Sequence, residues 1–346
     1  MIDSQSQYVD SHNSGHHNRK ALGCGCLGLF AGLIVFILFG ASAYLLNYAL
    51  KPSNNKGRDY PKQYALMKKR YPWIRQWVDS LQRTGALRDT LIMVPRREKR
   101  FNGVTGTWMH ALLVDAPHKT GNTAILIPGY TDCAANMLHF GYIYGHLMGM
   151  NLVIPDLHAN GKSDGEAMQM GWKDREDVNQ WISIASYKYR DSLDRASIVV
   201  HGVSMGAATA MNVSGGETSK SVKCFVEDCG YTSVWDEFDY EIGEEFGLPT
   251  FPLLYTASAL CDLKYGWSFG EASSVKEVAK CRKPMLFIHG GNDHFVPTRM
   301  VYSLYAAKPA PKQLVVFHGS RHARSYRDHR KEYEKVITAF VSKYMK

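Results

Sequence analysis

The stretch that decides the fold is SIVVHGVSMGAATAM, residues Ser197–Met211. A short run rich in Val and Ile leads into Gly202-Val-Ser204-Met-Gly206, and small residues follow, which predicts a buried strand, a turn and a helix. Such a turn lifts a serine hydroxyl above the edge of a sheet. Gly202 and Gly206 fit because a strained turn leaves no room for neighbouring Cβ atoms. We predict that Ser204 is a nucleophile; the alternative is a serine that only caps the helix.

The same alternation extends over the rest of the chain. Apolar runs alternate with helical stretches, and they read TAILIPG, NLVIPD, VKCFVED, PMLFIHG and QLVVFHG. This rhythm predicts an α/β fold with a mostly parallel sheet covered by helices on both faces. DTLIMVP and VTGTWMHALLVDAP are expected to form antiparallel strands ahead of it. The segment at about 231–280 is about three times the usual connection length, and we interpret it as a lid over the carboxyl edge of the strands.

A serine nucleophile needs a general base, and the base needs an acid that fixes its tautomer. With a nucleophile on this kind of turn, the partners follow in the order acid, then histidine. Asp293 comes just after the apolar run MLFIHG, and His322 follows QLVVFHG. Both are therefore predicted at the same sheet edge as Ser204. Asp228, which follows VKCFVED, is the alternative acid.

Acyl transfer also requires hydrogen-bond donors for the developing oxyanion. The residue after the nucleophile, Met205, supplies one backbone N–H. The second is expected in LIPGYTD, where Gly129 makes the turn and Tyr130 offers its N–H. The alternative for Tyr130 is an ordinary turn residue.

The N-terminal region divides into three parts. Residues 1–20 are polar and rich in His and are predicted to form a disordered tail. Residues 21–50 contain no charged side chain and are long enough to cross a bilayer as a helix. We favour a single-pass anchor with the catalytic domain on the extracytoplasmic side; a signal peptide cleaved near Ala41-Ser42-Ala43 is the alternative. Residues 51–86 are predicted as a linker and a lead-in helix packed on the 87–346 domain.

Composition excludes several classes of protein. The 346 residues carry a formal net charge of +9, but the Lys and Arg do not gather into an aromatic-interleaved stripe, so we expect no nucleic-acid partner. The seven cysteines include no CxxC pair, which argues against a zinc ribbon, and their odd number argues against a disulfide framework. No HExxH motif is present. We predict neither a metal nor another cofactor.

The ordered blocks PGYTDCAANM, PDLHANGKSDG, GWKDREDVNQWI, HGVSMGAAT, DCGYTSVWDEF, FIHGGNDHFVP and GSRHARSY resemble the α/β-hydrolase superfamily, in particular its bacterial serine-aminopeptidase-like branch. The resemblance covers roughly residues 87–346. It implies an eight-stranded sheet, a lid after the sixth strand, a triad at Ser204, Asp293 and His322, and an oxyanion pair at Tyr130 and Met205. Departures from the usual pattern occur at Pro128, His158 and Gly291, and none of them removes a triad member.

These observations predict a serine hydrolase that acts through an acyl-enzyme. The expected substrate is a carboxylic ester with a small or medium acyl group, and the alternatives are an aminopeptidase or amidase substrate and a thioester. The expected partners are that small-molecule ester or peptide and a lipid bilayer contacted through residues 21–50. A membrane-tethered binding protein built on a hydrolase fold is the alternative from a different class.

Overall fold

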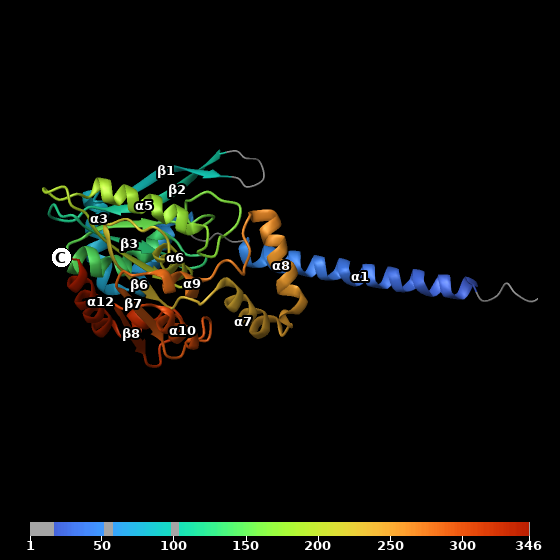
Figure 1. The fold of residues 1–346 in the computed structure, drawn as a ribbon. Helices are drawn as coiled ribbons and strands as arrows, with labels where there is room; N and C mark the ends of the chain where they lie inside the picture. Colours follow the sequence, from blue (N-terminus) through green and yellow to red (C-terminus); the bar gives the residue numbers. More distant parts are fainter. Residues whose placement is uncertain (1–16, 52–57, 98–103, 346) are drawn as a thin grey trace, which may run out of the picture.

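The computed structural model describes residues 17–51, 58–97 and 104–345. Eight strands in these ranges form one sheet, in the order β1-β2-β4-β3-β5-β6-β7-β8 (Figure 1). The β1–β2 and β2–β4 pairs are antiparallel, and the other neighbours pair parallel. The strands are β1 Leu87–Arg97, β2 Val104–Val114, β3 Asn122–Ile127, β4 Asn151–Pro155, β5 Ser197–Val203, β6 Val222–Asp228, β7 Met285–Gly290 and β8 Lys312–Phe317. The predicted mostly parallel, eight-stranded α/β fold is confirmed.

Helices cover both faces of the sheet, which is why its central strands are apolar along almost their whole length. The helical elements are α1 His17–Leu50, α2 Tyr60–Arg70, η2 Pro72–Ile74, α3 Arg75–Thr84, η3 Ala134–Met137, α4 Leu138–Gly141, η4 Tyr142–Leu147, α5 Asp174–Lys188, α6 Met205–Ser214, α7 Val234–Phe246, α8 Thr250–Tyr265, α9 Ser274–Lys280, α10 Arg299–Ala307, α11 Ser325–Asp328 and α12 Arg330–Tyr344. Core side chains on one face come from α5, α6, α9 and α10, and those on the other come from α2, α3, α4 and α12. Along β3, Ala124 and Leu126 point to one core while Ile125 and Ile127 point to the other, as the two-residue period of a strand requires.

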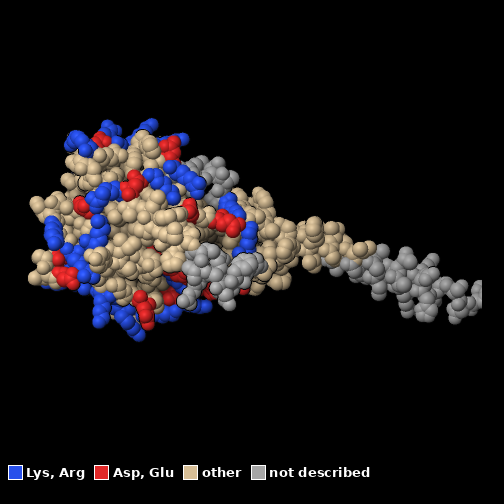
Figure 2. All heavy atoms as spheres, turned by 90° about the horizontal axis from the view of Figure 1, so that it is seen from above, with Lys and Arg blue, Asp and Glu red and all other residues tan. Residues whose placement is uncertain are grey.

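The N-terminal apolar segment is one continuous helix, α1, which projects from the globular body (Figure 1). Residues 1–16 of the predicted tail (residues 1–20) lie outside the described residues, and residues 17–20 form the first turn of α1. Gly32–Leu50 has a mean hydropathy of 2.0 and is long and apolar enough to cross a membrane. In Figure 2 the coloured part of α1 carries no Lys, Arg, Asp or Glu, whereas Lys and Arg are spread over the body.

Two further regions bear on the site. The predicted linker and lead-in helix cover residues 51–86, of which 52–57 lie outside the described residues. The helical elements α2, η2 and α3 follow. Gly85 ends α3 in the left-handed conformation that suits glycine. The range 231–280 contains α7, α8 and α9. The first two of these helices lie where α1 meets the body (Figure 1), and α8 packs against α1.

Candidate active site

Ser204 stands on the turn between β5 and α6. Its backbone angles, φ 56° and ψ −120°, lie in a region that L-residues rarely adopt. Glycines make this turn possible: a Cβ on Gly202 would overlap the backbone of Gly206, and a Cβ on Gly206 would overlap the carbonyl of Ile127 in β3. The two glycines predicted to flank the elbow thus lie where the chain has no space for a side chain.

The structure brings Ser204, His322 and Asp293 together. The His322 Nε2 atom lies 2.9 Å from Ser204 Oγ, and its Nδ1 atom lies 2.8 Å from Asp293 Oδ2. Asp293 follows β7 and His322 follows β8, so adjacent parallel strands deliver both to the edge where β5 ends. The Asp293 carboxylate is fully buried, whereas the His322 side chain keeps 21% exposure. The arrangement can remove a proton from Ser204 and hold the resulting imidazolium.

Several donors hold the Asp293 carboxylate in place. Its Oδ1 accepts 3.0 Å hydrogen bonds from the backbone N–H groups of Phe295 and Val296. His289 Nε2 lies 3.4 Å from Oδ2 and 2.9 Å from the Val296 carbonyl. Burial raises the pKa of Asp293, but the His289 and His322 hydrogen bonds outweigh burial and bring it to about 2. Asp293 is therefore ionised at neutral pH.

The alternative acid, Asp228, has another partner. Its Oδ2 accepts a 2.7 Å hydrogen bond from the Tyr333 hydroxyl of α12. Burial raises the pKa of Asp228 to about 6, although the Tyr333 hydrogen bond lowers it. The carboxylate hydrogen-bonded to the His322 ring is that of Asp293.

Both predicted oxyanion donors lie beside Ser204. Met205 is the first residue of α6, and the first N–H groups of a helix have no partner within the helix. Tyr130 follows β3, and it lines the same cavity as Ser204 and Met205. A Cβ on the preceding Gly129 would lie 3.4 Å from Ser204 Cβ, so this loop rests directly against the nucleophile.

A buried carboxylate anchors the loop that carries Tyr130. Asp156, just after β4, accepts hydrogen bonds from the Ala134 N–H (2.7 Å), the Lys162 N–H (2.8 Å) and the Tyr60 hydroxyl (2.5 Å), and it pairs with His110 Nδ1 (2.7 Å). It is fully buried. The Asp156 side chain thus links α2, β2 and η3 through hydrogen bonds.

Two site neighbours were not found from the sequence. His289 precedes Gly290 inside the apolar run of β7, where a histidine looks like an ordinary strand residue. The one sequence feature that could have indicated its role is its position four residues before Asp293. Cys229 follows Asp228, and its Sγ lies within 4.8 Å of an Asp293 carboxylate oxygen and of a His322 ring nitrogen. Burial raises the pKa of Cys229 well above its ordinary value. This favours the thiol over a reactive thiolate.

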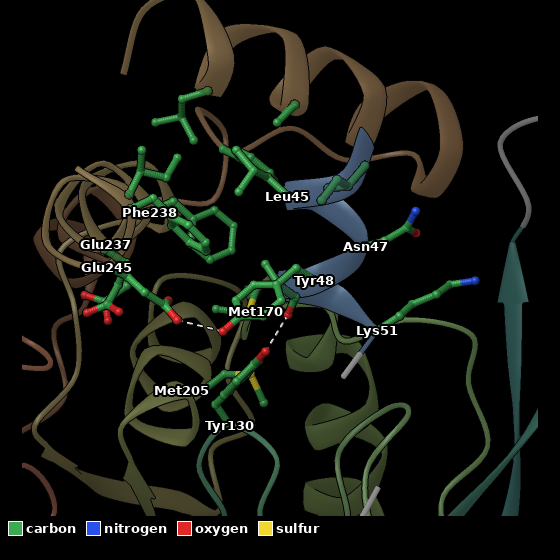
Figure 3. Close-up of a pocket in the computed structure, with 18 of the residues that line it drawn as sticks. Leu45, Asn47, Tyr48, Lys51, Tyr130, Met170, Met205, Glu237, Phe238 and Glu245 are labelled. Carbon is green, nitrogen blue, oxygen red and sulfur yellow. Dashed lines mark hydrogen bonds between the residues drawn. The ribbon is translucent and has the colours of Figure 1, made fainter. Parts of the chain in front are cut away.

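Ser204 opens into a cavity of about 710 Å³. Its lining combines the floor at Ser204, Met205 and Tyr130 with α7, α8 and the last turns of α1 (Figure 3). The Tyr130 hydroxyl donates a 2.7 Å hydrogen bond to the Ala49 carbonyl. The sequence predicted a lid here but not a wall built from the N-terminal apolar helix.

Comparisons with known proteins agree with this architecture. The prolyl oligopeptidase family matches residues 146–346, the range that contains Ser204, Asp293 and His322. The chain is 32% identical over 226 residues to the uncharacterized protein YqkD of Bacillus subtilis (strain 168), which covers 65% of this chain and 73% of that protein. It is 26% identical over 178 residues to the uncharacterized protein Rv2307c of Mycobacterium tuberculosis (strain ATCC 25618 / H37Rv), which covers 51% of this chain and about half, 54%, of that relative.

Two solved structures have the same fold. The Pyrococcus furiosus esterase Pf2001 superposes with a TM-score of 0.58 at 19% identity, covering 76% of this chain and 94% of that chain. The Pyrococcus horikoshii acylaminoacyl peptidase gives 0.54 at 14% identity, covering 78% and 44%. The resemblance to serine-peptidase-like α/β-hydrolases is confirmed, and this chain belongs to the prolyl oligopeptidase family.

Proposed function

We propose that the protein hydrolyses carboxylic esters of small or medium acyl groups through an acyl-enzyme at Ser204. The observation that carries the proposal is the hydrogen-bonded series Ser204–His322–Asp293, whose serine lies at the floor of a cavity with a largely apolar lining. A serine hydroxyl with a base within 2.9 Å and an ionised acid behind that base is equipped for acyl transfer.

In the proposed reaction, Ser204 Oγ attacks the carbonyl carbon while His322 Nε2 takes its proton. The oxyanion is stabilised by the backbone N–H groups of Met205 and Tyr130, and Asp293 holds the imidazolium. Collapse breaks the bond to the alcohol, which leaves with the proton from His322. Water, deprotonated by His322, then attacks the acyl-enzyme, releases the carboxylic acid and regenerates Ser204.

Amides and thioesters are the alternative substrates, because the same steps apply to their carbonyl carbons. The apolar lining favours the ester, because the transfer of an apolar acyl group from water into the cavity is favourable. A peptide would instead bring polar backbone groups into the cavity, which costs free energy. A purely binding role is disfavoured because it would not require a strained serine facing a histidine.

Fluorophosphonate labelling tests the proposal. We expect the full-length protein to be labelled, and Ser204→Ala to be unlabelled and to lose at least about a thousandfold in ester turnover. Ser183→Ala, which changes a serine whose hydroxyl donates a hydrogen bond to Asn179 in α5, is the matched control and should behave as wild type. Equal labelling of wild type and Ser204→Ala would overturn the assignment, and so would absence of turnover on ester, amide and thioester panels by folded protein.

We further propose that α1 is a single-pass membrane anchor and that the domain lies on the extracytoplasmic side. The anchor is favoured over a cleaved signal peptide because Ser42 Oγ donates a hydrogen bond to the Leu253 carbonyl of α8, and cleavage after Ala43 would remove it. An alkaline phosphatase fusion after residue 60 should be active. An inactive fusion would reverse the orientation, and a mature N-terminus at Tyr44 would replace the anchor by a signal peptide.

A further inference from the structure

The end of α1 is part of the cavity that holds Ser204. Residues 44–49 of α1 line it, opposite the lid helices. Two hydrogen bonds join α1 to the lid helices. Tyr48 donates a 2.7 Å hydrogen bond to Glu245 of α7, and Ser42 donates a 3.2 Å hydrogen bond to the Leu253 carbonyl of α8. Figure 3 shows Leu45 and Tyr48 on the α1 side and Phe238 on the lid side.

The same helix presents apolar side chains to its surroundings a few turns earlier. Leu29, Phe36 and Phe39 are 78%, 77% and 52% exposed, whereas Leu46 is buried. At 1.5 Å per residue, the five steps from Phe39 to Tyr44, the first residue of the wall, span about 7.5 Å along the axis. The surface of α1 that suits a bilayer therefore begins within about two turns of the cavity wall.

The lid also has exposed apolar side chains at this level. Phe251 and Tyr255 of α8 are 72% and 56% exposed, and Leu248, just before α8, is 41% exposed. They lie near Leu253, whose carbonyl receives the Ser42 hydrogen bond. Clustered exposed apolar side chains typically mark a membrane or protein contact, and a Tyr among them is typical of a membrane surface. Exposed apolar side chains thus occur on both α1 and α8, which pack against each other.

The interior of the cavity suits a chain of methylene groups. Its volume is in the range of small-molecule sites. The apolar side chains that line it include Leu45, Leu46, Met170, Met205, Phe238 and Ile242. Glu237, Glu241 and Glu245 of α7 and Lys51 also line it. Burial, and then neighbouring carboxylates, raise the pKa of Glu237 well above its ordinary value and that of Glu241 to about 7. The shift at Glu237 favours the uncharged acid, which is compatible with an apolar occupant.

We propose that the cavity takes the acyl chain of an ester dissolved in the bilayer, which enters past the exposed apolar side chains of α1 and α8 and places its carbonyl carbon at Ser204. This inference rests on the proposed function, whose acyl-transfer steps it leaves unchanged, and it adds the source and chain class of the substrate. A medium chain moves from one apolar environment into another, and it is preferred over acetyl because it fills the cavity with close contacts that an acetyl group cannot make.

The first test needs no substitution. The full-length protein in phosphatidylcholine vesicles is inactivated with fluorophosphonates that differ only in a methyl or a decyl chain. We expect the decyl compound to react more than tenfold faster per molecule in the membrane. Equal or slower inactivation by the decyl compound would overturn the inference while leaving Ser204 as the nucleophile, whereas no reaction with either would overturn the proposed function itself.

The second test changes the wall. Leu45→Gln should lower the ratio of kcat/KM for the umbelliferyl decanoate ester in vesicles to that for the acetate ester at least tenfold, because a polar group replaces an apolar contact. Leu193→Gln, in the loop before the amino end of β5 and 66% exposed, is the matched control and should keep the wild-type ratio. An unchanged ratio in folded Leu45→Gln, or preference for an aminoacyl amide over the decanoate, would overturn the inference.

Discussion

The hydroxyl of Tyr130 donates a 2.7 Å hydrogen bond to the backbone carbonyl of Ala49, in the last turn of α1. The final carbonyl groups of a helix have no partner within the helix, so Tyr130 caps α1 from the loop that follows β3. Since the Tyr130 N–H is the proposed second oxyanion donor, the end of the apolar helix and the catalytic floor are held as one unit.

Removal of this hydroxyl should loosen that unit without changing the loop backbone. We expect Tyr130→Phe to lower the free energy of unfolding by about 1 kcal/mol, because the Ala49 carbonyl loses its partner in a half-buried place. Thermal unfolding of the full-length protein in detergent measures the change. Tyr302→Phe, on the exposed face of α10, is the matched control, and equal midpoints for the two variants would contradict the expectation.

The second prediction concerns the pH dependence of stability. The folded-state pKa of Asp293, about 2, lies below its ordinary value of about 3.9, so its ionisation stabilises the fold above about pH 4, and this stabilisation of about 2 kcal/mol is lost as the pH falls through 2. His289→Gln removes one of the two imidazoles that lower this pKa. The loss begins near the unfolded-state pKa in both proteins, but we expect the variant to lose less stability in total because its folded-state Asp293 pKa is higher, as measured by urea unfolding between pH 2 and pH 6. Parallel curves for both proteins would show that His289 does not act on Asp293.

The order of the sequence determines much of this site, and the physical reason is the parallel sheet. Runs such as SIVVHG and MLFIHG predict strands, and parallel strands carry the residues that follow them to one edge, so Ser204, Asp293 and His322 could be predicted there, with Asp228 as the alternative acid. The part that α1 plays in the cavity wall could not be predicted in this way. Residues 21–50 look like one uniform apolar segment in the sequence. Ser42 is buried whereas Phe36 is exposed because Ser42 contacts α8, where its partner Leu253 lies 211 residues further along the chain.

The third prediction concerns the close approach of β3 and the elbow. A Cβ on Gly206 would overlap the Ile127 and Pro128 carbonyl oxygens, which are backbone atoms that cannot turn aside. We expect Gly206→Ala to lose at least about 2 kcal/mol of stability and most of the proposed ester turnover. Gly270→Ala has open space around its new methyl group and should stay within about 0.5 kcal/mol of wild type. Similar unfolding midpoints for the two variants would refute the steric explanation.

The fourth prediction addresses the buried carboxylate beneath the site. Asp156→Ala leaves the Tyr60 hydroxyl, two backbone N–H groups and His110 without their acceptor. Since each stranded buried donor costs about 1–3 kcal/mol, we expect a loss of at least about 3 kcal/mol in urea unfolding. Asp79→Ala breaks only a half-exposed ion pair with Lys68 and should cost less than about 1 kcal/mol. A loss below that of Asp79→Ala would show that the network relaxes around the missing carboxylate.

The last prediction separates catalysis from strain at Ser204. Its φ of 56° and ψ of −120° cost about 1–3 kcal/mol for a residue with a Cβ, and glycine escapes this cost. Against this, glycine loses about 0.4–1 kcal/mol more backbone freedom on folding than alanine. The difference leaves Ser204→Gly more stable than Ser204→Ala by about 1 kcal/mol, although both variants lack the nucleophile and should be equally inactive. Denaturant unfolding of the two variants measures this difference directly. If Ser204→Gly proves the less stable, the elbow stores no strain that a side chain must bear, and its geometry is set by the contacts of Gly202 and Gly206 alone.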